Sequence, residues 1–269
     1  KGLMFPIADS NGDPITQEYA KARMRWEPVV ETTQIKGDSE THPALSPNDE
    51  FANFETYDHT IESGDQEEVA LFGDGFIGQL TEEDRKLLEA NEERVATAGD
   101  YTRSGLLRGL VIEERVGANP YKFGMIGSTD SHTSMSSAEE DNFWGKMALD
   151  STPENTLDPS KVVVPPTSYG ADMGAAGVAA VWATENTREG LVEAFQRKEV
   201  YATTGPRIEL RFFGGWGFRN KDARARDIAG VGYSKGVPMG GDLSGADAGK
   251  APSFLVRAVK DPVGANLDR

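Results

Sequence analysis

Short β-branched segments that alternate with helix signals constrain the fold of this sequence more than any other feature. Residues 29–35 (V-V-E-T-T-Q-I) predict a buried strand. A helix is predicted to begin at Thr81, and a second helix carries an apolar face over residues 106–111. Residues 122–127 then predict another strand. This alternation predicts an α/β fold with parallel strands across residues 1–135.

The sequence divides into two predicted units. Residues 1–205 carry the α/β pattern, whereas helical signals vanish after Val200, so residues 206–269 predict a β-rich extension. Within the first unit, residues 43–78 are acidic and lack a clear period, which predicts an insertion or a lid. Residues 151–173 are rich in Pro, Ser, Thr and Gly and predict a long loop.

Composition narrows the classes of partner. The 269 residues carry a formal net charge of −16, which repels nucleic-acid phosphates and anionic lipid, so we expect neither a nucleic-acid nor a membrane partner. The absence of cysteine excludes disulfides and thiolate metal sites. The sequence opens at Lys1 without an initiator Met, so a periplasmic or secreted location is open if a signal peptide precedes it. The oligomeric state is also open.

The strongest chemical signal is the pair Asp130 and His132, which stand two residues apart directly after a predicted strand. Open α/β sheets and barrels place their functional sites at this edge. Carboxylate oxygen and imidazole nitrogen are ligands of catalytic zinc, manganese and iron. The alternative is that Asp130 caps a turn and His132 is an ordinary polar loop residue.

Two residues of the first predicted strand region add to this signal. Glu31 is a carboxylate in the middle of a β-branched run, where it must be paired, protonated or bound to metal, unless the strand lies at an edge and Glu31 faces water. His42 follows the next turn and can fold back to the same edge. The alternative for His42 is a solvated loop histidine.

One further motif is set aside. Residues 232–236 spell the G-x-S-x-G of serine hydrolases, in which a tight turn between strand and helix exposes the serine. The following residues do not favour a helix, and no histidine follows the serine, because His132 is the last histidine of the chain. We therefore assign this segment to a loop.

Several longer motifs resemble a bacterial family of domains of unknown function that is allied to the PHP (polymerase and histidinol phosphatase) superfamily of metallohydrolases. The first is W-E-P-V-V-E-T-T-Q-I-K-G-D-S-E-T-H-P from Trp26, and the second is G-S-T-D-S-H from Gly127. W-A-T-E-N-T-R-E follows from Trp182, E-V-Y-A-T-T-G-P-R-I from Glu199 and G-V-P-M-G-G-D-L from Gly236. These motifs run through nearly the whole chain, which resembles the later half of such a protein.

The resemblance implies a fold and a metal centre. It implies a distorted PHP-type barrel of parallel strands, incomplete at the N-terminus, whose C-terminal edge binds two or three divalent ions of zinc, manganese or iron. Glu31, Asp130 and His132 match ligands of the superfamily, and His42 matches a further one. The early H-x-H pair of the superfamily is not in this sequence. We expect it upstream.

The resemblance also implies a reaction class, which is hydrolysis of a small-molecule ester by a metal-activated water. The substrate is a phosphoester or a carboxylic or carbamic ester or amide, with Asp130 also acting as the catalytic residue that steers the proton. Arg207 can contact a substrate anion, or it is an exposed strand residue paired with a carboxylate such as Glu209. The competing hypothesis is a non-catalytic relative that keeps the scaffold for binding.

Overall fold

The arrangement of the chain comes from a computed structural model. It describes residues 4–35, 37–43, 45–53, 99, 101–135, 139–158, 160–164, 168–170, 173, 175, 177–245 and 249–267. Most of the predicted lid at residues 43–78, and the helix predicted to begin at Thr81, lie outside this part of the chain. None of the described helices is long and apolar enough to cross a membrane.

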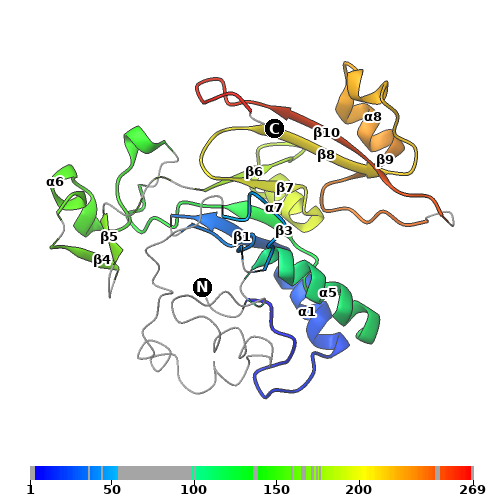
Figure 1. Ribbon diagram of the computed structural model, residues 1–269, viewed down its shortest axis with the longest axis horizontal. Helices are drawn as coiled ribbons and strands as arrows, with labels where there is room; N and C mark the ends of the chain where they lie inside the picture. Colours follow the sequence, from blue (N-terminus) through cyan, green and yellow to red (C-terminus); the bar gives the residue numbers. More distant parts are fainter. Residues whose placement is uncertain are drawn as a thin grey trace.

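The centre of the molecule is a short sheet in the order β2-β1-β3. Strand β1 (Val29–Gln34) pairs in parallel with β3 (Gly124–Gly127), and β2 (Gly37–Asp38) folds back antiparallel on β1. The register places Glu31 opposite Ile126 and shifts directly after it. Figure 1 shows β1 and β3 near the middle of the molecule, next to β6 (Val178–Val181) and β7 (Val200–Thr203), which form an antiparallel pair.

The prediction of a barrel is not met by the residues that the structure describes. The fold is mixed α/β, as predicted, but its strands form small open sheets. Only β1 and β3 pair in parallel among the described strands. The antiparallel strand β2 occupies one edge of this sheet, and closure needs a continuous ring of paired strands.

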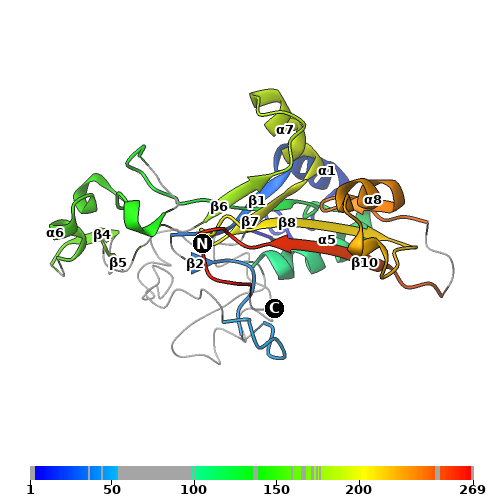
Figure 2. The same cartoon turned by 90° about the horizontal axis from the view of Figure 1, so that it is seen from above.

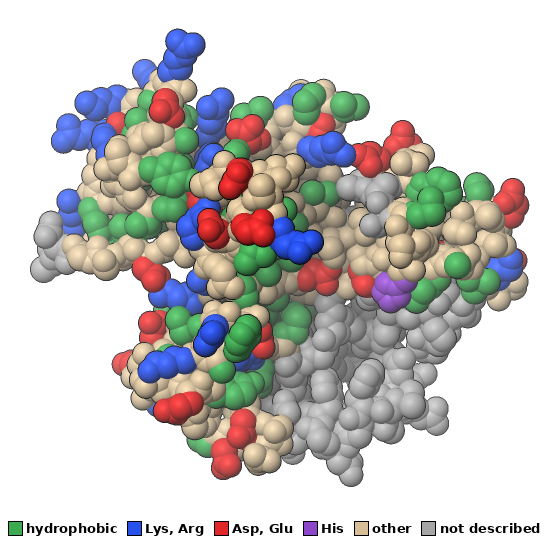
Figure 3. Space-filling model, turned by 180° about the vertical axis from the view of Figure 1, so that it is seen from behind, with side chains coloured by type: hydrophobic (Ala, Val, Ile, Leu, Met, Phe, Trp, Pro, Cys, Tyr) green, Lys and Arg blue, Asp and Glu red, His purple; other side chains and the backbone are tan. Residues whose placement is uncertain are grey.

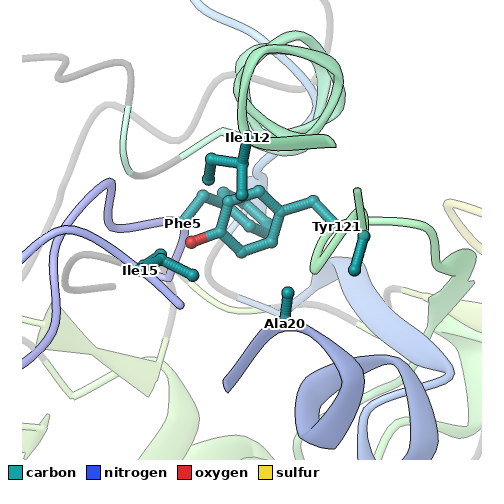
Figure 4. Close-up of a cluster of buried hydrophobic side chains, with 6 residues drawn as sticks. Phe5, Ile15, Ala20, Ile112 and Tyr121 are labelled. Carbon is teal, nitrogen blue, oxygen red and sulfur yellow. The ribbon is translucent and has the colours of Figure 1, made fainter. Parts of the chain in front are cut away.

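Two helices lie beside the end of the central sheet at which β1 and β3 begin (Figure 1). α1 (Gln17–Trp26) begins at Thr16, whose hydroxyl accepts from the backbone of Tyr19, and it runs beside α5 (Thr102–Val116) (Figure 1). Between them lies a core of buried side chains around Tyr121, in which α1 contributes Ala20 and α5 contributes Ile112 (Figure 4). The other members of this core are Phe5, Ile15 and Ala118.

The apolar face predicted for α5 is not the face that it buries. Leu107, Leu110 and Val111 are exposed, whereas Gly105 and Gly109 are buried together with Ile112. The reason is the close approach of the helix backbone to the core. A Cβ at Gly105 would lie 2.6 Å from the ring of Phe5, so the glycine stripe brings the helix backbone onto the core.

The segment 151–173 is not a plain loop. It contains the short helix α6 (Pro153–Thr156) and a two-stranded hairpin of β4 (Val162–Val164) and β5 (Ser168–Tyr169). Two 3-10 turns, η1 (Glu140–Asn142) and η2 (Ala148–Asp150), precede it. Figure 2 shows α6 and this hairpin at the opposite end of the molecule from α8 (Ile228–Lys235).

The C-terminal unit is β-rich, as predicted, but it also contains helix. Its sheet has the order β10-β8-β9, with β8 (Glu209–Gly215) between β10 (Ser253–Val259) and β9 (Gly236–Pro238), all antiparallel. The sequence predicted no helix here, yet α8 packs on this sheet after the 3-10 turn η4 (Asp222–Arg224).

Helix α8 forms because tertiary contacts override a glycine-rich composition. Asp227 caps it by accepting from the backbone of Gly230 at 2.8 Å. Gly232 faces the sheet, and a Cβ there would lie 2.5 Å from the ring of Phe213. The glycine that weakens the intrinsic helix propensity is therefore the residue that lets the helix reach the sheet.

A polar cluster joins this C-terminal sheet to the rest of the molecule. The buried carboxylate of Glu199, at the N-terminal side of β7, accepts from the hydroxyl of Tyr233 on α8 and lies 3.5 Å from the guanidinium of Arg211 on β8. Arg211 also stacks over the ring of Trp182, 3.2 Å from its centroid. α7 (Arg188–Arg197) connects Trp182 to Glu199 along the chain.

The surface near α8 is locally basic although the whole chain is acidic. Figure 3 shows Lys and Arg side chains gathered at the end of the molecule that α8 and η4 form. The exposed members that follow one another closely in the sequence are Arg219, Lys221, Arg224 and Arg226. The average charge therefore does not describe this surface.

Candidate functional site

The loop that follows β3 carries Asp130 and His132, and neighbouring segments hold its start in place. The backbone N–H of Ser128 donates to the carbonyl oxygen of Thr33 at 3.0 Å. Gly177 packs against the same point with a φ of 88°, and a Cβ there would lie 2.1 Å from the Ser128 carbonyl oxygen. Only glycine suits such a position, so the loop begins at a fixed place beside the end of β1.

Asp130 has a left-handed backbone, with a φ of 49°. This conformation is uncommon outside glycine, and Asp and Asn tolerate it best. Its carboxylate Oδ2 lies 2.6 Å from the ammonium nitrogen of Lys146, and its main-chain oxygen accepts from the same group. Asp130 therefore presents two oxygens to one cation. Strained backbone of this kind gathers at functional sites.

His132 completes a cluster with Asp130 and Lys146. Its Nε2 lies 3.2 Å from Oδ1 of Asp130 and 3.0 Å from Nζ of Lys146. An ammonium can only donate, so in the shorter contact the lone pair of Nε2 accepts from Lys146. The side chain of Lys146 is 2% exposed and that of Asp130 is 23% exposed. A buried cation thus holds a carboxylate and an imidazole together.

A second loop fixes the backbone of Lys146. Its N–H donates to Oδ2 of Asp150 at 2.9 Å, its carbonyl oxygen accepts from the N–H of His132 at 2.7 Å, and the N–H of Met147 donates to Oδ1 of Asp150 at 2.6 Å. Gly145, with a φ of 79°, makes the turn that precedes it, and its carbonyl oxygen accepts from Ser131. The two loops therefore form one hydrogen-bonded unit.

Glu31 lies on β1, beside the strand that leads into this loop. Its carboxylate accepts from the hydroxyl of Ser128, two residues before Asp130. β1 and β3 are parallel, with Glu31 opposite Ile126, and the hydrogen bond to Ser128 links Glu31 to the start of the Asp130 loop. Glu31 is half-buried and hydrogen-bonded to Ser128, and its role as a metal ligand stays a prediction.

His42 lies in a turn after β2. Its carbonyl oxygen accepts from the backbone of Leu45 and Ser46, and its ring centroid is 6.0 Å from that of Tyr101, which precedes α5. The ring of His42 is therefore placed next to the N-terminal end of α5. Its predicted role as a metal ligand stays a prediction.

The donors suit a divalent cation in kind but do not make a full shell. Asp130 and His132 supply carboxylate and imidazole atoms that already share one cation, which is the chemistry of a metal-binding pair. Within the part of the chain that the structure describes, no three His, Asp or Glu side chains are arranged to hold a metal ion together. Glu31 is linked to this loop through Ser128, but Glu31, Asp130 and His132 do not form such a group.

Comparison with known families assigns the chain to one of them. The family model described as Protein of unknown function (DUF3604) matches residues 1–79 and 64–269. The chain belongs to the DUF3604 family. No curated protein and no solved structure matches it. The family assignment agrees with the resemblance seen in the motifs, and it leaves the link to the PHP superfamily as an inference from those motifs.

Arg207 of this DUF3604 chain lies on the surface. Its side chain is 71% exposed and pairs with Glu139, and its backbone N–H donates to Asp261 at 2.7 Å. The carboxylate partner is therefore Glu139 and not the neighbouring Glu209 that the sequence suggested. Exposed pairs of this kind contribute little to stability. The predicted contact of Arg207 with a substrate anion stays a prediction.

Sequence reasoning missed Lys146 as a member of the site. A lysine is usually exposed, and the surrounding W-G-K-M carries no ligand pattern, so no signal in the DUF3604 sequence pointed to it. The assignment of the G-x-S-x-G segment to a loop is wrong, because most of it belongs to α8. Ser234 lies inside α8, where its hydroxyl donates to the carbonyl oxygen of Val231, and not at a turn between strand and helix.

Proposed function

We propose that this protein is a metal-dependent hydrolase of the PHP type. The observation that carries the proposal is the convergence of the Asp130 carboxylate and the His132 imidazole on one cation, in the loop after a parallel strand. This edge is where α/β folds place their sites. The motif resemblance supports the same interpretation, and with it a PHP-type barrel.

The metal shell needs more donors than this pair. Glu31 is linked to the same loop, because its carboxylate accepts from the hydroxyl of Ser128. His42 and an H-x-H pair of the kind that the resemblance implies would complete the set that we propose for two or three zinc, manganese or iron ions. Imidazole and carboxylate donors of this kind favour these metals over calcium or magnesium.

The chain's own residues then act around the bound substrate. When bound, the metal supplies an activated water and polarises the scissile group. The Asp130 carboxylate accepts the proton of the water and returns it to the leaving group. Arg207 reaches a substrate anion only by exchanging its ion pair with Glu139. The substrate is a small phosphoester or a carboxylic or carbamic ester or amide.

The second candidate is a non-catalytic binding protein on the same scaffold. The observation that favours it is the pairing of Lys146 with both predicted ligands, because a satisfied ion pair is also a structural element. The two readings differ in one respect. In a scaffold, Asp130 and His132 stabilise the fold, whereas in an enzyme they bind the catalytic metal.

Metal binding by single-residue variants tests the proposal. The full chain and its Asp130→Asn and His132→Gln variants are titrated with zinc and manganese by calorimetry, followed by a panel of phosphoesters and carboxylic esters. We expect each variant to bind metal at least tenfold more weakly while keeping its circular dichroism spectrum. Unchanged metal affinity in both variants, with a loss of stability instead, would support the scaffold.

A further inference from the structure

Lys146 differs from the other groups near the candidate site because its ammonium is buried and contacts three acceptor atoms. It contacts the main-chain oxygen and the carboxylate of Asp130 and the Nε2 of His132. Of these, the Asp130 carboxylate and the His132 imidazole are the groups that the proposed function assigns to a metal. The lone pair of Nε2 is decisive, because this nitrogen has a single in-plane acceptor position.

We propose that Lys146 is a built-in competitor of the metal, an internal cation that must withdraw before a divalent ion can bind Asp130 and His132. The inference rests on the proposed function. A metal bonded to both residues lies about 2.0 to 2.2 Å from each donor atom. The ammonium already lies 2.6 Å from one donor and 3.0 Å from the other, so the two cations cannot occupy this position together.

The exchange involves the side chain of Lys146 and not its backbone. Asp150 and His132 hold the main chain of Lys146 on both sides of the peptide unit. The four-carbon stem can rotate while this backbone stays fixed, because lysine has many rotamers. Metal entry is then a local swap of one cation for another. The swap keeps the Asp130 carboxylate paired with a cation in both states.

Removal of the charge tests this exchange directly. Lys146→Met keeps the length and apolar bulk of the stem but has no ammonium. We expect its calorimetric Kd for zinc or manganese to be about tenfold lower than that of the unaltered chain, which corresponds to about 1.4 kcal/mol. Lys146→Arg retains the positive charge and should bind the metal no more tightly than the unaltered chain.

Thermal unfolding supplies a readout that is independent of activity. Without metal, Lys146→Met should melt below the unaltered chain, because the Asp130 carboxylate loses its cation. Added zinc should then raise its melting temperature more than it raises that of the unaltered chain. Lys122→Met is the matched control, because Lys122 also pairs with an aspartate at 2.6 Å, in this case Asp242. Its zinc response should be unchanged.

The outcomes separate the two proposals. If Asp130→Asn and His132→Gln leave metal affinity unchanged, the proposed function itself fails. If these variants weaken binding but Lys146→Met binds metal with equal or lower affinity, the metal site stands and the competition by Lys146 is refuted. A tighter Kd in Lys146→Met that disappears in the double variant with Asp130→Asn establishes the exchange at this site.

Discussion

Asp150 offers the sharpest test of how the candidate site is held. Its side chain is buried, with 1% of the residue exposed, and its two carboxylate oxygens accept from the backbone of Lys146 at 2.9 Å and of Met147 at 2.6 Å. Asp150→Ala leaves both N–H groups without these acceptors. A hydrogen bond to a charged group contributes about 1.5 to 3 kcal/mol, so we expect a loss of about 3 kcal/mol in the free energy of unfolding.

Urea denaturation followed by circular dichroism measures this loss, and amide hydrogen exchange at Lys146 and Met147 locates it. Asp158→Ala is the matched control. Its carboxylate also accepts two hydrogen bonds, both from Ser160, but the group is far more exposed than Asp150. Water replaces those bonds, so the control should change stability much less. A loss for Asp150→Ala no larger than that of the control would refute the reasoning.

Two further substitutions test the packing at the start of the Asp130 loop and in the core between α1 and α5. Gly177→Ala should lower the free energy of unfolding in urea by about 3 kcal/mol, because its Cβ would lie 2.1 Å from the Ser128 carbonyl oxygen at a positive φ. Gly12→Ala is the control, with a φ of 83° and open space around it, and should lower it by about 1 kcal/mol. Equal losses in the two variants would contradict the clash at Gly177. Tyr121→Phe should cost about 1 to 2 kcal/mol, because the carbonyl oxygen of Pro6 loses its buried donor. Burial raises the pKa of the Tyr121 phenol, so in the unaltered protein stability should fall as the pH rises above about 10, and this fall should be shallower in Tyr121→Phe.

The sequence by itself determined where several elements lie. The β-branched run at 29–35 became β1, the run at 122–127 became β3, and Gly117 ends α5 with the left-handed backbone that a helix stop predicts. These features depend on local backbone preferences, which act within a few residues. The position of Asp130 and His132 directly after a strand follows from the same local signals.

Only the tertiary structure decided which faces pack and what the polar groups contact. Leu107 and Leu110 of α5 are exposed because Gly105 of that helix fits against the ring of Phe5, and α8 formed because Gly232 fits the ring of Phe213. Lys146 likewise entered the site through the fold of the 145–150 loop. Its partner atoms belong to residues 14 and 16 positions earlier. Hydrophobic periodicity reports the average polarity of a face, whereas close packing and the pairing of buried charge depend on which distant segment arrives there.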